Sequence, residues 1–200
     1  RQMCIRDRAY RDDNNIMCRY PHHKPKTYPT KENEADQKLA SKIRKLGGQL
    51  RGLVNLRSGV EMPESLKGVV DEDIYIRGRL QGAKGLALYH LMSRLRSSRA
   101  ALVEHLLGTK VASQRFAITE HIKNEETGNV LGRLKESAEY LPVSTLKDKL
   151  PKWLVDPEEH RIAVEKEVEI YDEILELVGK MSDRREYAKA ELLAQLLDKH

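Results

Sequence analysis

The stretch that decides the fold spans residues 156–179 and reads DPEEHRIAVEKEVEIYDEILELVG. It opens with Asp156 at a helix N-cap position and Pro157 at the first helical position, and two glutamates follow in the first turn. Gly179 is a typical helix end. Between them, apolar residues recur at alternating spacings of four and three, as on the buried face of a helix: Val164, Val168, Tyr171, Leu175 and Val178. The stretch therefore predicts a long amphipathic helix over residues 157–178.

The rest of the chain carries similar signals. Apolar stripes, capping residues and terminal glycines or prolines predict further helices over 33–58, 71–107, 111–123, 130–140, 145–149 and 183–198. The last two helices are joined by a short connector, which predicts an antiparallel hairpin. Aromatic residues make up only 5% of the chain, which argues against a β-sandwich or barrel. We therefore expect an all-α fold, an irregular bundle of about five to seven amphipathic helices with a C-terminal helical hairpin.

Particular side chains in these helices are expected to be buried. Leu50 and Leu175 lie on apolar stripes and are expected in the core, and Ile118 and Ile122 are expected to point inward. In the last helix, one face gathers the apolar residues Tyr187, Ala190, Leu193 and Leu197.

Glycines interrupt two of the predicted helices. Each glycine costs up to about 1 kcal/mol relative to alanine, so the pair Gly47-Gly48 indicates a bend or a close helix approach. A second group weakens the first half of the 71–107 helix and leaves a later start open: Gly78, Gly82 and Gly85. Their spacing lacks the Lys-Ser or Lys-Thr of a phosphate-binding loop, and is more typical of close helix contact.

The N-terminal 30 residues have no helical periodicity. Three prolines recur in the basic, tyrosine-containing stretch 20–29, and each removes a backbone donor and favours extended structure. We expect residues 1–30 to form an extended basic arm that is ordered only by a partner. Residues 31–200 form the helical domain, and a division into 31–142 and 143–200 stays open.

The first eight residues, RQMCIRDR, resemble a translated sequencing-adapter peptide. On that interpretation Cys4 does not belong to the protein and the chain is a fragment, so the sequence leaves open whether a targeting peptide precedes it. The two cysteines, Cys4 and Cys18, form no disulfide framework, so a reducing compartment such as the cytoplasm or an organelle matrix is favoured. No apolar run approaches the roughly 20 residues of a membrane span.

Charge is distributed unevenly along the chain. Residues 1–100 contain 21 Lys and Arg against 11 Asp and Glu, whereas residues 101–200 contain 15 against 20. This asymmetry suggests that the first half meets an acidic surface such as nucleic acid, or that the two halves meet each other; ordinary solvated faces are the third interpretation. The candidate contact residues for nucleic acid or an acidic partner are Lys24, Lys26, Lys42, Arg44, Lys45, Arg51, Arg57, Arg94, Arg96 and Arg99.

No pattern typical of a catalytic or metal site stands out. Cys18 with His22 and His23 has ligand chemistry, but no second Cys/His pair follows at zinc-finger spacing. Three Glu-His neighbours would point about 100° apart on a helix, so they make poor relays and are expected to be exposed: Glu104-His105, Glu120-His121 and Glu159-His160. We expect no catalytic residue, metal or cofactor.

One short stretch resembles a known family. Residues 42–53, KIRKLGGQLRGL, are similar to the first-helix signature of the copper- and formaldehyde-sensing helical repressors. That family needs a Cys at the opening of the next helix, where this sequence offers Ile76, and a second ligand pair downstream is missing. No ligand is therefore carried over.

These observations favour a non-enzymatic function. We expect a helical accessory or adaptor subunit of a larger protein or ribonucleoprotein assembly, with a protein partner and RNA as a further partner. The alternative is a free-standing nucleic-acid-binding or regulatory protein, which would be stable alone and bind a defined oligonucleotide.

Overall fold

The computed structural model describes residues 27–120 and 125–198, together with the backbone of two short strands nearer the N-terminus. These strands, β1 (Tyr10–Arg11) and β2 (Met17–Cys18), pair antiparallel. The described part of the chain holds eight α-helices: α1 (Glu34–Gly47), α2 (Glu72–Ser97), α3 (Arg99–Leu107), α4 (Thr109–Arg115), α5 (Val130–Glu136), α6 (Lys152–Val155), α7 (Pro157–Lys180) and α8 (Arg184–Leu197). Four 3₁₀ turns lie between them: η2 (Leu53–Asn55), η3 (Glu64–Leu66), η4 (Ser137–Glu139) and η5 (Lys147–Lys149). The expected all-α class is confirmed.

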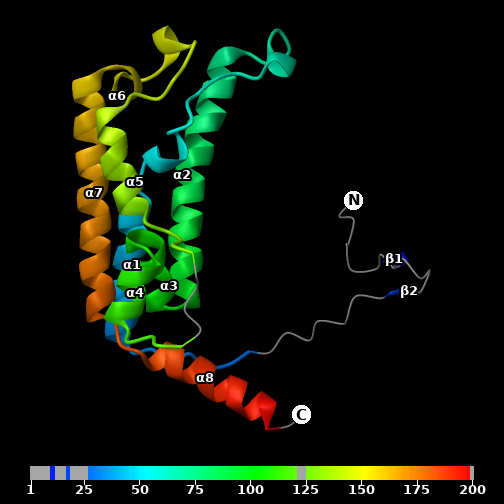
Figure 1. Ribbon diagram of the computed structural model, residues 1–200, viewed down its shortest axis with the longest axis vertical. Helices are drawn as coiled ribbons and strands as arrows, with labels where there is room; N and C mark the ends of the chain where they lie inside the picture. The colour runs from blue at the N-terminus through cyan, green and yellow to red at the C-terminus, as the bar shows by residue number, and fades with distance from the viewer. Residues whose placement is uncertain (1–9, 12–16, 19–26, 121–124, 199–200) are drawn as a thin grey trace.

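The helices form an elongated bundle bounded by two long helices, α7 and α2 (Figure 1). Between them, α1 packs against both α7 and α2, and α3 contacts α2, α5 and α7. Leucine, isoleucine and valine side chains from these helices meet in one hydrophobic core. Leu50 is completely buried and Leu175 is 8% exposed, so both residues occupy the core as expected.

The helix predicted from the opening stretch is α7, which has more buried residues than α2, the other long helix of the bundle. The Asp156 carboxylate accepts a hydrogen bond from the Glu159 N–H (2.9 Å), which caps α7 as the sequence indicated. Val164, Tyr171 and Val178 are buried on the face that meets α1, α3 and α5. The helix continues through Gly179 and ends at Lys180, two residues beyond the predicted end at Val178.

The first helix is shorter than predicted, because it ends at Gly47 rather than near residue 58. A Cβ on Gly47 would lie 2.5 Å from Leu91 Cδ2, so this glycine allows the close approach of α1 to α2 that the sequence indicated. Gly52 then turns the chain with φ of +76°, and its missing Cβ would lie 2.2 Å from the Ala83 carbonyl oxygen. Only glycine fits this contact with α2 without strain.

The predicted helix 71–107 is divided in two at Ser98. Ser98 is extended (φ −171°, ψ 165°), and its hydroxyl accepts a hydrogen bond from the Ala101 N–H (3.0 Å), so it caps α3 instead of continuing α2. At the other end, Asp71 caps α2 through the N–H groups of Asp73 and Ile74. The helix therefore begins at its acidic turn, with all three glycines inside it.

Other predictions need correction. The helix expected over 111–123 is α4, which ends at Arg115, and Ile118 is 41% exposed rather than inward; Ile122 lies outside the described residues. The last two helices are joined by a short connector, but they do not form an antiparallel hairpin. Instead, α8 leaves the end of α7 at a wide angle and projects from the bundle (Figure 1). The helices that pack against α7 are α1, α3, α5 and α6.

Candidate functional site

The described residues offer no metal site. No group of three or more His, Cys, Asp or Glu in this part of the chain is placed to hold a metal ion. The side chains of Cys18, His22 and His23 lie outside the described residues. Among the described helices, none is long and apolar enough to cross a membrane.

Three of the predicted basic contact residues are engaged within the chain. Lys42 forms an ion pair with Glu173 (2.8 Å), Arg57 with Glu136 (3.1 Å) and Arg99 with Glu186 (3.4 Å). All three acids belong to the acidic second half of the sequence, so part of the charge asymmetry is met by contacts between the halves. Most of these side chains are partly exposed, and each such pair contributes only about 0–1 kcal/mol.

The remaining basic candidates have different surroundings. The guanidinium of Arg51 lies over the Trp153 ring, with 5.0 Å from Cζ to the ring centroid. Four others are exposed and form no ion pair with any described acid: Arg44, Lys45, Arg94 and Arg96. Lys24 and Lys26 lie outside the described residues.

Arg94 lines a small polar pocket between α2, α3 and α5. The pocket has a volume of about 160 Å³, and its lining is Arg94, Ala101, Glu104, His105, Thr127, Gly128 and Arg133. Glu104 accepts hydrogen bonds from the hydroxyls of Thr127 (2.8 Å) and Thr109 (3.1 Å). Burial lowers the pKa of His105 to about 4, and electrostatic repulsion from the neighbouring His90, Arg94 and Arg133 adds to this effect. His105 is therefore neutral at pH 7, and the two arginines supply the positive charge of the pocket.

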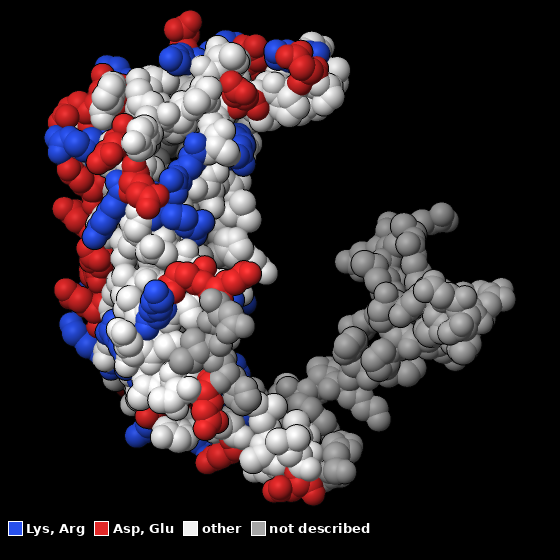
Figure 2. Space-filling model, in the orientation of Figure 1, with Lys and Arg blue, Asp and Glu red and all other residues white. Residues whose placement is uncertain are grey.

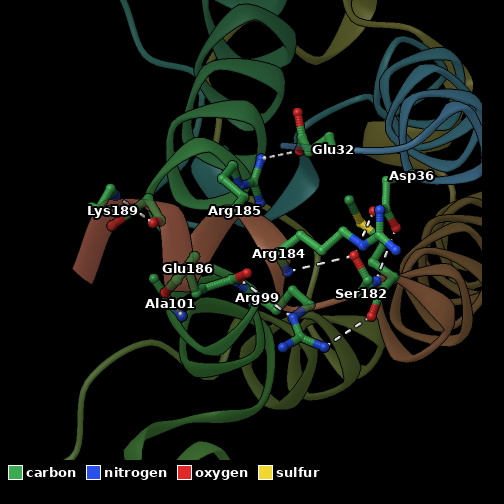
Figure 3. A network of polar contacts seen from close by, with 12 residues as sticks. Glu32, Asp36, Arg99, Ala101, Ser182, Arg184, Arg185, Glu186 and Lys189 are labelled. Atoms are coloured by element: carbon green, nitrogen blue, oxygen red, sulfur yellow. Dashed lines mark hydrogen bonds and ion pairs between the residues drawn. The ribbon is translucent and has the colours of Figure 1, made fainter. Parts of the chain in front are cut away.

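A polar network holds the start of α8 against the bundle (Figure 3). The Arg99 backbone N–H donates to Glu186 (2.8 Å) and its guanidinium donates to the Met181 carbonyl (2.8 Å). In the connector, the Ser182 N–H donates to the Asp36 carboxylate (2.9 Å). Burial opposes ionisation of Asp36, but the bonds from Ser182 outweigh it and lower the Asp36 pKa.

Polar contacts of α8 with the rest of the described chain reach only as far as Glu191. Lys189 donates to the Ser97 carbonyl (2.7 Å), and Glu191 pairs with Lys31 (2.7 Å). Beyond Glu191, no side chain of α8 forms a hydrogen bond or ion pair with the rest of the described chain. The helix is therefore fixed at its N-terminal half and projects from there.

The apolar face of α8 points away from the bundle. Ala188 is the buried residue of this helix, and it lies on the side opposite the apolar face. The face named from the sequence is exposed: Tyr187 is 65%, Leu193 56% and Leu197 78% accessible to solvent, and Ala190 is exposed as well. The sequence correctly grouped these four residues on one face, but in the described chain nothing covers that face.

Two polar residues of α7, Glu167 and His160, are buried although the sequence did not predict it. Glu167 on α7 is 2% exposed and accepts hydrogen bonds from the N–H groups of Arg51 (3.0 Å) and Leu53 (3.2 Å). The sequence does carry a signal for this burial, because Glu167 stands on the apolar stripe of α7 between Val164 and Tyr171. His160, expected to be exposed, is 2% exposed, and its ring nitrogens lie 2.9 and 3.0 Å from the carbonyl oxygens of Trp153 and Ser137. These contacts tie α7 to the segments before it.

Comparisons with protein families, with curated proteins and with solved structures find no match for this chain. The candidate interaction surfaces of the described chain are the exposed face of α8 and the exposed basic residues.

Proposed function

We propose that the protein is a non-enzymatic helical adaptor, an accessory subunit that docks onto a protein partner through α8. The observation that carries this proposal is the apolar face of Tyr187, Ala190, Leu193 and Leu197, which is exposed on a helix that projects from an otherwise well-packed bundle.

Physical chemistry supports a docking role for this face. Helices of fewer than about 12–15 residues are marginal in water, and most helical stability in proteins comes from packing of an apolar face. α8 has 14 residues, and only its first half is tied to the bundle. Amphipathic helices with apolar anchors at such spacings typically bind in a hydrophobic groove of a partner. The partner expected here is a protein with an apolar groove about as long as four helical turns.

Affinity purification tests this proposal. The tagged full-length chain is compared with the double variant Leu193→Lys/Leu197→Lys and with the control Gln195→Lys, which changes an exposed residue on the other side of α8. We expect one protein to co-purify with the wild type and the control but not with the double variant. Melting temperatures should be equal for all three, because no bundle contact is altered. Retention of the same proteins by the double variant would contradict the proposal.

A second candidate function is nucleic-acid binding, and the pocket favours it. Arg94 and Arg133 line the pocket without an ion-pair partner among the described acids, and guanidinium groups bind phosphate oxygens in a bidentate manner. The pocket volume of about 160 Å³ suits a phosphate group rather than a drug-sized ligand. Arg44, Lys45 and Arg96 would add further phosphate contacts.

Filter binding of RNA and DNA across a salt series tests this second function. Removal of one phosphate-binding side chain should reduce the slope of log K against log salt by about 0.7–0.9. The variant Arg94→Gln/Arg133→Gln should therefore bind more weakly with a shallower slope, whereas the control Lys166→Gln, on the exposed side of α7, should match the wild type. Binding that is absent, or that does not depend on salt, would exclude this function.

A further inference from the structure

The outer face of α2 carries a line of eight exposed residues that spans the whole helix and its N-cap: Asp71, Ile74, Gly78, Gly82, Gly85, Tyr89, Ser93 and Arg96. We call this line the α2 stripe. The buried residues of α2 lie on the opposite side of the helix: Ile76, Ala83, Ala87, Leu91 and Leu95. The stripe is therefore on the side of α2 that is turned away from the core. The helix itself lies at one edge of the bundle (Figure 1), where uncharged atoms predominate between a few charged groups in the view of Figure 2.

Nothing in the described chain explains why this face is apolar and built from glycine. A Cβ on Gly78, Gly82 or Gly85 would have no neighbour within 4 Å, unlike one on Gly47 or Gly52. Each of these three glycines costs up to about 1 kcal/mol relative to alanine in an exposed helix. On the same stripe, Ile74 is 57% and Tyr89 is 64% exposed.

Two copies of the α2 stripe that run antiparallel are complementary to each other. Its spacings are 3, 4, 4, 3, 4, 4 and 3 residues, which read identically from either end. In an antiparallel pairing, Asp71 therefore meets Arg96 of the second copy, and Tyr89 meets Gly78. Gly82 meets Gly85 on either side of the two-fold axis, where missing side chains let two helix backbones approach closely.

From this register we propose that the α2 stripe is the interface of a homodimer, in which two α2 helices cross antiparallel about a two-fold axis between Gly82 and Gly85. The charges at the ends of the stripe select this arrangement. A parallel pairing would place Asp71 opposite Asp71 and Arg96 opposite Arg96, whereas the antiparallel pairing forms two opposite-charge contacts. The interface is isologous, as in most two-fold dimers.

Dimensions also agree with a helix pair. At a rise of 1.5 Å per residue, the stripe from residue 71 to residue 96 is roughly 38 Å long. Large side chains flank the glycines, since Leu86 is 45% exposed beside the stripe. The dimer uses α2 and leaves the apolar face of α8 free, so it is independent of the proposed adaptor function.

Sedimentation equilibrium of the full chain tests this proposal. We expect the wild type to be a dimer whose dissociation constant is raised at least tenfold by Gly82→Leu, because a leucine at the two-fold axis separates the helices. In the monomer the same substitution meets open space and replaces a poor helix former, so the melting temperature of the dissociated chain should not fall. The control Lys84→Leu adds the same side chain to an exposed position of α2 off the stripe and should leave the dimer intact.

A second variant keeps the test independent of the glycine. Arg96→Glu should also weaken the dimer at least tenfold at low salt, because two like-charge contacts replace two opposite-charge contacts, and high salt should reduce this difference. A wild type that is monomeric over the whole concentration range would overturn the proposal, whether or not residues 1–26 of the same chain cover the stripe. So would a dimer that both Gly82→Leu and Arg96→Glu leave as tight as the wild type.

Discussion

Removal of the buried Glu167 carboxylate should destabilise the protein in a measurable and specific way. In the native state this side chain accepts two hydrogen bonds from the turn that connects α1 to η2, those of Arg51 (3.0 Å) and Leu53 (3.2 Å). Burial raises the Glu167 pKa, and the bonds from the backbone of residues 51–53 oppose that rise. Burying the Glu167 carboxylate therefore costs desolvation free energy, and its hydrogen bonds to the Arg51 and Leu53 N–H groups stabilise the turn.

The magnitude follows from the groups left unpaired. Each buried N–H without a partner costs about 1–3 kcal/mol, so Glu167→Ala, which leaves two of them unpaired, should lower the free energy of unfolding by about 2–6 kcal/mol. Glu167→Gln keeps the shape and one acceptor, and it removes the desolvation cost of the charge, so about 1–2 kcal/mol is expected. The control Glu169→Gln, one of the exposed positions of α7, should change stability by less than about 0.5 kcal/mol.

Urea denaturation at neutral pH measures these differences, with an unchanged m-value as the sign that the native and denatured states keep their compactness. If Glu167→Gln and Glu169→Gln have equal midpoints, Glu167 does not hold the turn, and the account of how α7 fixes the end of α1 is wrong.

Three further substitutions probe the core, the turn and the pocket. Leu50→Ala removes a fully buried side chain and should cost about 2–5 kcal/mol in urea denaturation; a loss below about 0.5 kcal/mol would place its stripe at the surface. Gly52→Ala puts a Cβ into left-handed backbone and against the Ala83 carbonyl, so it should cost roughly 2 kcal/mol or more by the same assay, and a neutral result would contradict the contact of this turn with α2. The folded pKa of His105, about 4, lies below its unfolded value of about 6.5, so the unfolded state binds the proton more strongly and stability should fall as the pH decreases from 6.5 to 4. After allowance for partial exposure the loss is about 2 kcal/mol. His105→Gln should flatten this part of the stability profile, and an unchanged profile would exclude the assignment.

Local signals predicted the helices whose ends and faces are determined nearby in sequence. The Asp156-Pro157 start and the stripe of α7 needed no knowledge of the rest of the chain, and Gly47 indicated a close contact that the structure locates at Leu91. The sequence did not predict the break at Ser98, because the apolar pattern continues on both sides of this residue. A serine also occurs inside helices, and only the extended backbone in the structure shows that Ser98 caps α3.

The sequence alone could not predict the contacts between residues far apart in the chain. Periodicity grouped the apolar residues of α8 on one face, but it says nothing about whether another element covers that face, and the direction of α8 depends on Arg99 and Asp36, far away in the chain. In the same way, charge counting identified Lys42 and Arg57 as candidates but not their pairing with Glu173 and Glu136. The pocket joins residues of α2, α3 and α5, so Arg133 was missed although Arg94 was named.

Site-specific photo-crosslinking tests whether the exposed face of α8 docks onto a protein partner. A photoreactive benzoyl-phenylalanine is placed at Leu193 on the apolar face, or at Gln195 on the other side of the same helix, in the full chain expressed in its source cells. Docking through this face predicts a covalent adduct with one partner protein from position 193 and none from position 195. No adduct at either position, or equal adducts at both, would contradict it.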